Sequence, residues 1–309
     1  MLFRSHAAKP FDCIGLGMIA LDHLLTVKHY PAPNSKHKVE SHVQQGGGPV
    51  PTALSVLGIL GKRTALISKV GRDMAGQTLI DELSTLQVDT SAMIIADIST
   101  PQSFIVIDSQ TGERTVLLSR PAEAQVNAKE LDVELIRQAR CLHVDAHDVE
   151  ATMRAVRVAK EQNVLVSVDI GSNRSLPPDF FEFVDIAIVS EDFANAQLEK
   201  NNSLKNAEKL VHWGATLAAV TCGANGSYVA TATDAFFQPA FPVTPVDTTG
   251  AGDVFHGAAL FAILEHYSVR QTAAFASAAA ALACTRVGGK AGIPKFQDIQ
   301  RFLQHHENV

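Results

Sequence analysis

Short β-rich runs alternate along this chain with segments of helical periodicity, and this alternation restricts the possible folds more than any other feature. Parallel strands joined by right-handed helical crossovers produce such a pattern. The sequence therefore predicts an α/β fold with a mostly parallel sheet flanked by helices. The predicted strands are 12–18, 64–70, 141–144, 164–169, 186–189 and 217–221, and the predicted helices include 52–60, 76–86, 150–161 and 204–212.

Two regions interrupt this alternation. Residues 36–45 alternate in polarity without a following helix, and residues 93–118 contain three short extended runs separated by turns at 99–101 and 109–112. Such runs favour antiparallel pairing. We expect a small inserted sheet, formed by about 34–46 and 93–119, that acts as a lid on a single domain spanning residues 1–309.

The charge balance excludes several classes of partner. The chain has 26 Lys and Arg against 32 Asp and Glu, a formal net charge of −6, so it has no basic field for nucleic acid or an anionic membrane. The start of the chain lacks a signal peptide, and the longest apolar run, 273–284, is shorter than a membrane span and predicts a core helix. The widely spaced Cys13, Cys141, Cys222 and Cys284 indicate reduced core thiols, so we expect a soluble, cytoplasmic protein.

The most informative stretch is Val-Asp-Thr-Thr-Gly-Ala-Gly-Asp-Val-Phe at 246–255, which precedes a helical run over 256–266. Small residues at a helix N-terminus leave backbone N–H groups free to bind an anion such as phosphate. Asp253 would then lie in the first turn, where a carboxylate can accept a proton from an attacking hydroxyl. Alternatively, Asp253 only complements the helix dipole; the length of the motif, with Asp247 upstream, favours the phosphate site.

With this motif the sequence resembles the ribokinase-type, or PfkB, family of carbohydrate kinases. A second family motif is Gly-Gly-Gly-Pro-Val-Pro-Thr-Ala at 46–53, continuing to Gly61 and then to Val-Gly-Arg-Asp at 70–73 and Gly76. Two long motifs in the right order, about 200 residues apart, are far more specific than one Gly-rich tetrapeptide. The resemblance implies a doubly wound α/β domain with a small β lid, and an ATP-dependent kinase that phosphorylates a hydroxyl of a sugar or a sugar-like substrate.

The resemblance also implies residue roles at the reacting end. Asp253 matches the family's catalytic base, and Gly250, Ala251 and Gly252 match its anion hole. Asp22 matches the position that binds sugar hydroxyls, although a solvated turn Asp is the alternative. Gly47 and Gly48 would let the backbone approach the sugar closely, because a Cβ there would collide with it.

Further positions match the family's nucleotide and cation sites. Thr221, Gly223 and Gly226 match the nucleotide-binding turn. Ser277 aligns with a position that borders adenine, and an ordinary structural role within a helix is an equally good interpretation of this serine. Asp247 and Thr249, with the loop 286–292, resemble a monovalent-cation site. The expected cofactors are therefore ATP and Mg²⁺, with K⁺ as a further candidate.

The sequence also departs from the family pattern. Thr52 stands where the family often has an Asn that contacts the sugar. The family's Asn-x-x-Glu motif, which organises magnesium and phosphate, falls at 190–193, where both key positions differ and Ser190 replaces the Asn. Glu191 or Asp192 is then the candidate for the magnesium role.

Within the family, the sequence resembles sulfofructose kinases in particular. They share the continuation Asp-Val-Phe-His-Gly and an ending like that at 284–294, and Lys36 matches a lysine near their sulfonate. The positions of their sulfonate-binding Asn and Arg are Leu118 and His147 here, which removes bidentate recognition of a strong anion. We therefore expect a neutral or differently charged sugar, with His147 in the substrate pocket; a sulfofructose-type kinase is the alternative.

Two other motifs indicate rival functions. Gly-Leu-Gly-Met-Ile-Ala at 15–20 fits a dinucleotide fingerprint, but Leu24–Val27 reads as strand where that fingerprint requires a helix. His143, Asp145, His147 and Asp148 could ligate a metal, but a strand end facing the cleft explains them better. A binding or regulatory protein on the same scaffold, without turnover, stays the alternative to the kinase. An exposed lid face would also favour a homodimer.

Overall fold

A nine-stranded sheet forms the centre of the computed structural model, which describes residues 9–111, 114–172 and 174–307. Its strand order is β15-β14-β13-β12-β11-β10-β1-β4-β6. The seven strands from β6 to β13 pair in parallel, and β14 and β15 pair antiparallel at one edge. The strands are β1 (Phe11–Leu16), β4 (Thr64–Ile67), β6 (Val88–Asp89), β10 (Ala139–Val144), β11 (Leu165–Ile170), β12 (Ile186–Ser190), β13 (Leu217–Thr221), β14 (Ser227–Thr231) and β15 (Ala235–Gln238).

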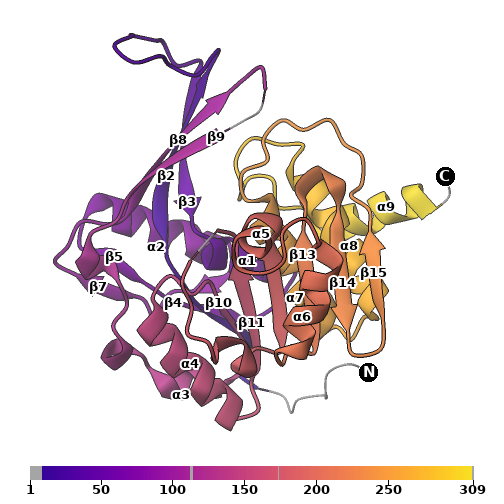
Figure 1. Cartoon of the computed structure of the whole chain (residues 1–309). Coiled ribbons are helices and arrows are strands. Elements are labelled where there is room, and N and C mark those ends of the chain that lie inside the picture. The colour runs from indigo at the N-terminus through magenta and orange to yellow at the C-terminus, as the bar shows by residue number, and fades with distance from the viewer. Residues whose placement is uncertain (1–8, 112–113, 173, 308–309) are drawn as a thin grey trace.

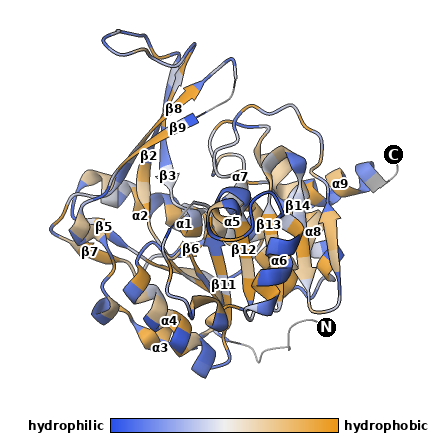
Figure 2. Ribbon diagram, viewed as in Figure 1, coloured by the Kyte–Doolittle hydropathy of each residue, from blue (hydrophilic) through white to orange (hydrophobic). Residues whose placement is uncertain are grey.

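Helices cover both faces of this sheet, as the alternating pattern predicts (Figure 1). One face packs on α1 (Pro49–Ile59), α2 (Met74–Thr85), α7 (Ala251–Leu264), α8 (Val269–Ala283) and α9 (Phe296–Glu307). The other packs on α3 (Val133–Arg137), α4 (Val149–Glu161), α5 (Glu191–Gln197) and α6 (Ser203–His212), with short 3₁₀ turns at Ala122–Ala124, Ala128–Glu130, Phe180–Phe183 and Gly223–Asn225. Each face has its own hydrophobic core, and Figure 2 shows hydrophobic residues along the central strands.

A separate four-stranded sheet projects from the main body (Figure 1). Its order is β3-β2-β8-β9, from β3 (Ser41–Gly47), β2 (Ala20–Val27), β8 (Gln102–Asp108) and β9 (Arg114–Ser119). We call it the projecting sheet. Residues 36–40 of the predicted alternating run lie in an exposed loop instead of a strand. Of the predicted turn at 109–112, Gly112 lies outside the described residues.

The predicted strand 64–70 is two strands. After β4 the chain leaves the large sheet and forms β5 (Lys69–Gly71), which pairs with β7 (Ile94–Ala96) in a third, two-stranded sheet. Ser68 lies at this break, and its hydroxyl donates to the carbonyl of Gly17 at 2.7 Å. The start of the region 93–119 therefore belongs to this third sheet, and its later part belongs to the projecting sheet.

Local sequence explains where two of the helices begin. Pro49 is the first residue of α1, where its missing N–H costs no hydrogen bond. Ser268 and Gln271 form a capping box at the start of α8, the helix that contains the apolar run 273–284. Within the described residues, no helix has the length and apolarity needed to cross a membrane. All four cysteines are free thiols.

Candidate active site

The direction in which successive strands are added to the sheet reverses between β1 and β10. From β1 the chain adds β4 and β6 on one side, and it later adds β10 to β13 on the other. At such a switch point the loops after the two strands diverge and leave a crevice at their carboxyl ends, where ligands of open α/β sheets bind. The candidate site is therefore expected at the carboxyl ends of these strands.

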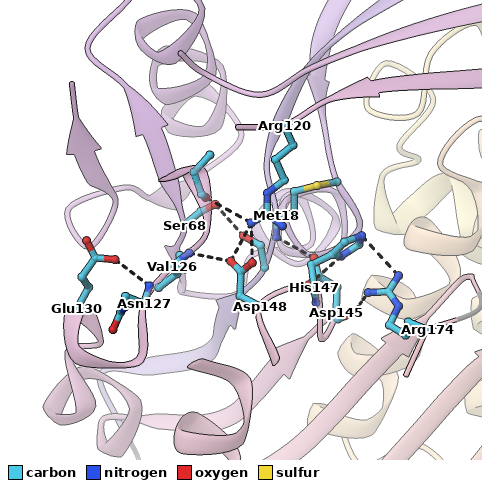
Figure 3. Close-up of polar contacts among 12 residues, drawn as sticks. Met18, Ser68, Arg120, Val126, Asn127, Glu130, Asp145, His147, Asp148 and Arg174 are labelled. Carbon is cyan, nitrogen blue, oxygen red and sulfur yellow. Dashed lines mark hydrogen bonds and ion pairs between the residues drawn. The ribbon is translucent and has the colours of Figure 1, made fainter. Parts of the chain in front are cut away.

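The carboxylate of Asp145 joins the ends of β1 and β10. Its Oδ2 accepts a hydrogen bond from the backbone N–H of Met18 at 2.8 Å (Figure 3). A Cβ at Gly17 would lie 2.5 Å from the same oxygen, so glycine is required there. Asp145 is buried; burial opposes its ionisation, but hydrogen bonds from His147 and Met18 hold its pKa below the ordinary value.

His147 and Arg174 lie beside Asp145. His147 Nδ1 is 3.2 Å from Asp145 Oδ1, and its Nε2 is 3.5 Å from Arg174 Nη2 (Figure 3). β10 ends at Val144, so Asp145 and His147 lie in the loop after the strand. The predicted end of this strand at Val144 is therefore confirmed, and Asp145 and His147 follow it at the carboxyl edge of the sheet.

The neighbouring polar residues are occupied by other partners. Asp148 accepts two hydrogen bonds from Arg120, at 2.7 and 2.9 Å, and another from the N–H of Val126 (Figure 3). His143 is fully buried, and burial lowers its pKa to about 3. Across residues 9–111, 114–172 and 174–307, no group of three or more His, Cys, Asp or Glu is arranged to hold a metal ion.

The N-terminus of α7 presents backbone amides, as the sequence motif predicts. Gly250 caps the helix in the left-handed conformation, with φ of 76°, and contributes no side chain to the cap. The first N–H groups of a helix have no intrahelical acceptors, so they are available to an anion. A Cβ at Gly252 would meet no atom within 4 Å in the described part of the chain, so the space beside this glycine is open.

Asp253 lies in the first turn of α7, beside this open space. Burial raises the pKa of its carboxyl well above the ordinary value, and the nearby carboxylates Asp169 and Asp22 raise it further, whereas Arg114 opposes the shift. A carboxyl group with a raised pKa is a stronger base once it is ionised. Asp253 is thus suited to accept a proton.

Asp247 fixes the loop that precedes α7. Its Oδ1 accepts a hydrogen bond from the N–H of Thr249, and its Oδ2 accepts one from the N–H of Gly288, both at 2.8 Å. Gly288 belongs to the loop between α8 and α9, and a Cβ at Gly250 would lie 2.8 Å from the Cα of Gly289. The structure therefore brings Asp247, Thr249 and the predicted cation loop together.

Asp22 and the glycines of the first motif meet at the base of the projecting sheet. A Cβ at Gly47 would lie 2.0 Å from Asp22 Oδ2, and one at Gly48, where φ is 107°, would lie 2.2 Å from the carbonyl oxygen of Met18. Burial raises the pKa of Asp22 to about 6, opposed by its hydrogen bond to Ser103 and by the charge of Lys290. Thr52 is buried in α1, one turn after Gly48.

The predicted nucleotide-binding residues meet at the ends of β12 and β13, where Ser190 pairs with Thr221 in the sheet register. The hydroxyl of Ser190 caps α5 by accepting from the N–H of Phe193 at 3.1 Å. Glu191 accepts a hydrogen bond from Ser203 at 3.2 Å. Gly223 and Gly226 both have positive φ, and the position of a Cβ at Gly223 is open space in the described structure.

The two remaining predicted residues lie on other elements. Lys36 is in the exposed loop between β2 and β3. Ser277 is buried in α8. The dinucleotide fingerprint at 15–20 leads into β2 and not into a helix, which confirms that it is no NAD motif.

The comparisons with known proteins agree with this geometry. Residues 11–295 match the pfkB family carbohydrate kinase. The chain belongs to this family. A ribokinase of Haemophilus influenzae is 25% identical over 300 residues, which cover 94% of this chain and 97% of that protein. Ketohexokinase of Mus musculus is 24% identical over 303 residues, covering 94% and 99%.

Solved structures of family members share the fold. The ribokinase of Thermotoga maritima superposes with a TM-score of 0.82 at 24% identity, over 95% of this chain and 99% of that one. Arabidopsis thaliana ribokinase, solved with ribose and ATP, has a TM-score of 0.82 at 19% identity, over 95% and 99%. The predicted fold class is confirmed, and this carbohydrate kinase is an ATP-dependent phosphotransferase.

Three charged residues of the kinase, Asp145, Lys290 and Arg114, have no role that the sequence alone predicts. Asp145 was weighed as a metal ligand and otherwise interpreted as part of a strand end, Lys290 was included only as a member of the loop 286–292, and no motif contained Arg114. Arg114, at the start of β9, donates from Nη1 to the hydroxyl of Thr248 at 2.9 Å and so connects the projecting sheet to the loop before α7. Arg114 and Thr248 both line an open cavity of 820 Å³. A local pattern could not reveal this contact, because 134 positions separate the two residues.

Proposed function

We propose that this kinase transfers the γ-phosphoryl group of ATP to a hydroxyl of a neutral sugar, with Asp253 as the base and the N-terminus of α7 as the phosphoryl site. One observation carries the proposal: Asp253 lies in the first turn of α7 beside the open space at Gly252 and interacts electrostatically with Asp22. The base, the anion site and a hydroxyl-binding carboxylate are therefore neighbours.

The residues divide the reaction between them. Asp22 accepts hydrogen bonds from sugar hydroxyls, and Gly47 and Gly48 allow the backbone to approach the ring. Asp253 takes the hydroxyl proton as the sugar oxygen forms its bond to the γ-phosphorus and the bond to the ADP oxygen breaks. The N–H groups of Gly250, Ala251 and Gly252 stabilise the charge on the transferring group.

The nucleotide end is assigned to the ends of β12 and β13. Thr221, Gly223 and Gly226 would hold ATP. Ser190 would lie beside them, and Ser277 would lie near the adenine ring. Mg²⁺ is normally held by substrate phosphates together with only one or two carboxylates. Among the described residues no cluster of three or more His, Cys, Asp or Glu could hold a metal ion. Glu191 is therefore our candidate for the single carboxylate ligand. The ion would neutralise phosphate charge. Asp247 and Thr249 would contribute to a binding site for K⁺.

The pocket chemistry supports a neutral sugar. Leu118 lies on β9 directly opposite Ser103 of β8. Because Ser103 is the hydrogen-bond partner of Asp22, this apolar side chain lies on the strand position next to the carboxylate assigned to the sugar. Arg174, the guanidinium nearest to His147, lies beside the carbonyl and carboxylate of Asp145. A sulfonate or phosphate would need a free guanidinium fork here. The likeness to sulfofructose kinases therefore concerns the scaffold and not the substrate.

The test is an ADP-release screen over ketoses, aldoses, nucleosides and their phosphates, with and without K⁺. We expect neutral sugars to give the highest kcat/KM, and a preference for anionic sugars would contradict this.

Asp253→Asn should abolish ADP release with every accepted sugar, while ATP binding measured by calorimetry stays nearly unchanged. Unchanged turnover in that variant would refute the role of the base.

A further inference from the structure

Lys290 is a buried charged residue between the two halves of the site. It lies in the loop between α8 and α9, and only 4% of its side chain is exposed. Its Nζ is 3.0 Å from Glu82 Oε1 on α2. Beyond this ion pair, no hydrogen-bond partner for Nζ is present in the described part of the chain. A buried ammonium with unused donors has a high desolvation cost, so its presence calls for an explanation.

The ion pair continues to the base of the projecting sheet. Glu82 Oε2 accepts a hydrogen bond from the backbone N–H of Gly46 at 2.6 Å. A Cβ at Gly46 would lie 2.6 Å from Lys290 Nζ, so the ammonium packs directly on this glycine. Gly46 precedes Gly47 and Gly48, the backbone assigned to the sugar. Lys290 therefore contacts the sugar-binding strand both directly and through Glu82.

The same loop contacts the phosphate end. Two residues before Lys290, the N–H of Gly288 donates to Asp247, and Gly289 packs against Gly250 at the start of α7. A Cβ at Gly288 would lie 2.3 Å from Oε1 of Gln45 in β3. Lys290 also interacts electrostatically with Asp22 and Asp253, the two carboxylates of the transfer site. One short loop thus touches both substrate ends.

We propose that Lys290 is a positioning residue for phosphoryl transfer, which with Glu82 holds the sugar-binding backbone at Gly46–Gly48 in place relative to the phosphate-binding start of α7. The inference rests on the proposed function of this site. Small displacements of reacting groups reduce rates by large factors, so an ion pair that fixes this separation has a direct effect on transfer.

The experiment compares Lys290→Met with the double variant Lys290→Met/Glu82→Gln. The single variant leaves Glu82 without its cation, whereas the double variant removes both charges and keeps an acceptor for the N–H of Gly46. Replacing both members of a buried ion pair by neutral groups is often nearly neutral for stability. We therefore expect the melting temperature to recover in the double variant.

The catalytic defect should persist in both variants. We expect kcat/KM for the sugar to fall by about tenfold or more, with the KM for ATP changed by less than about threefold. A kcat/KM that returns to the wild-type value together with the melting temperature would show a structural role only and overturn the proposal, as would a single variant with unchanged kcat/KM.

Lys62→Met is the matched control. Lys62 is also a mostly buried lysine, with 13% of its side chain exposed, and is paired with Glu265. This pair lies at the opposite ends of α1 and α7 from Gly48 and Gly250, so its loss should leave kcat/KM unchanged. If the wild-type kinase phosphorylates no sugar in the screen, the proposed function fails; if it is active and Lys290→Met is equally active, only the present inference fails.

Discussion

At the scale of single residues, the site concentrates carboxylates that favour function at the expense of stability. Asp22 is the clearest case, because burial raises its pKa from 3.8 to about 6. Between these two pH values the folded protein binds more protons than the unfolded chain, so this residue lowers the stability as the pH rises through that window. At neutral pH its full destabilising effect is present.

Asp22→Asn should therefore stabilise the kinase at pH 7.5 by up to about 3 kcal/mol, and this gain should shrink as the pH is lowered towards 4. The same variant should raise the KM for the sugar by about tenfold or more, because the amide accepts fewer hydroxyl hydrogen bonds. Urea denaturation at several pH values and steady-state kinetics measure both effects. A gain in stability that does not depend on pH would contradict this explanation.

The pH profile of catalysis follows from the same group. Protonated Asp22 is a poorer acceptor for sugar hydroxyls, so kcat/KM for the sugar should fall below about pH 6, by about tenfold per pH unit for one proton. Protonation of Asp253, whose pKa is raised as well, acts in the same direction. A profile measured at saturating ATP checks this, and activity that is constant down to pH 5 would rule out control by Asp22.

At the scale of elements, the start of α7 combines the proposed phosphoryl site with a regular helix. Gly252→Ala separates these two properties. Alanine inside a helix is more stable than glycine by about 0.5–1 kcal/mol, and the new methyl group would meet no atom of the described chain. The variant should unfold at a slightly higher temperature and yet lose at least about tenfold in kcat, because the methyl group occupies the phosphoryl space. Full activity would place the phosphoryl group elsewhere.

The sequence predicted most elements but not how they separate into sheets. The strands at 217–221 and 186–189 and the helices at 150–161 and 204–212 have strong local patterns, and the structure places them within a residue or two. The break after β4 depends on Ser68 bonding to Gly17, a contact between distant residues that no local pattern encodes. The same reason explains why Asp145 and Lys290 received no role: their importance comes from partners on other elements.

At the scale of the molecule, the projecting sheet exposes apolar side chains. Phe104 and Leu117 are directly paired across β8 and β9 and are 40% and 58% exposed. Such a surface favours coverage by a second copy of the chain, in line with the expected homodimer. Leu117→Glu should then give a monomer in sedimentation velocity, whereas Met74→Glu, at a still more exposed apolar position on α2, should leave the dimer intact. A wild-type protein that sediments as a monomer would contradict the dimer.

The topology places β1 inside the large sheet, third from the β6 edge, although it is the first strand of the described residues. Asp22 follows it early, but the amides of α7 and the loop with Lys290 come from residues 250–290. A nascent chain on the ribosome can therefore assemble most of the sheet while it still lacks half of its active site. On the proposed mechanism, newly made kinase should consume no ATP until the loop with Lys290 has been synthesised, and a product truncated before Gly250 should be inert rather than partly active.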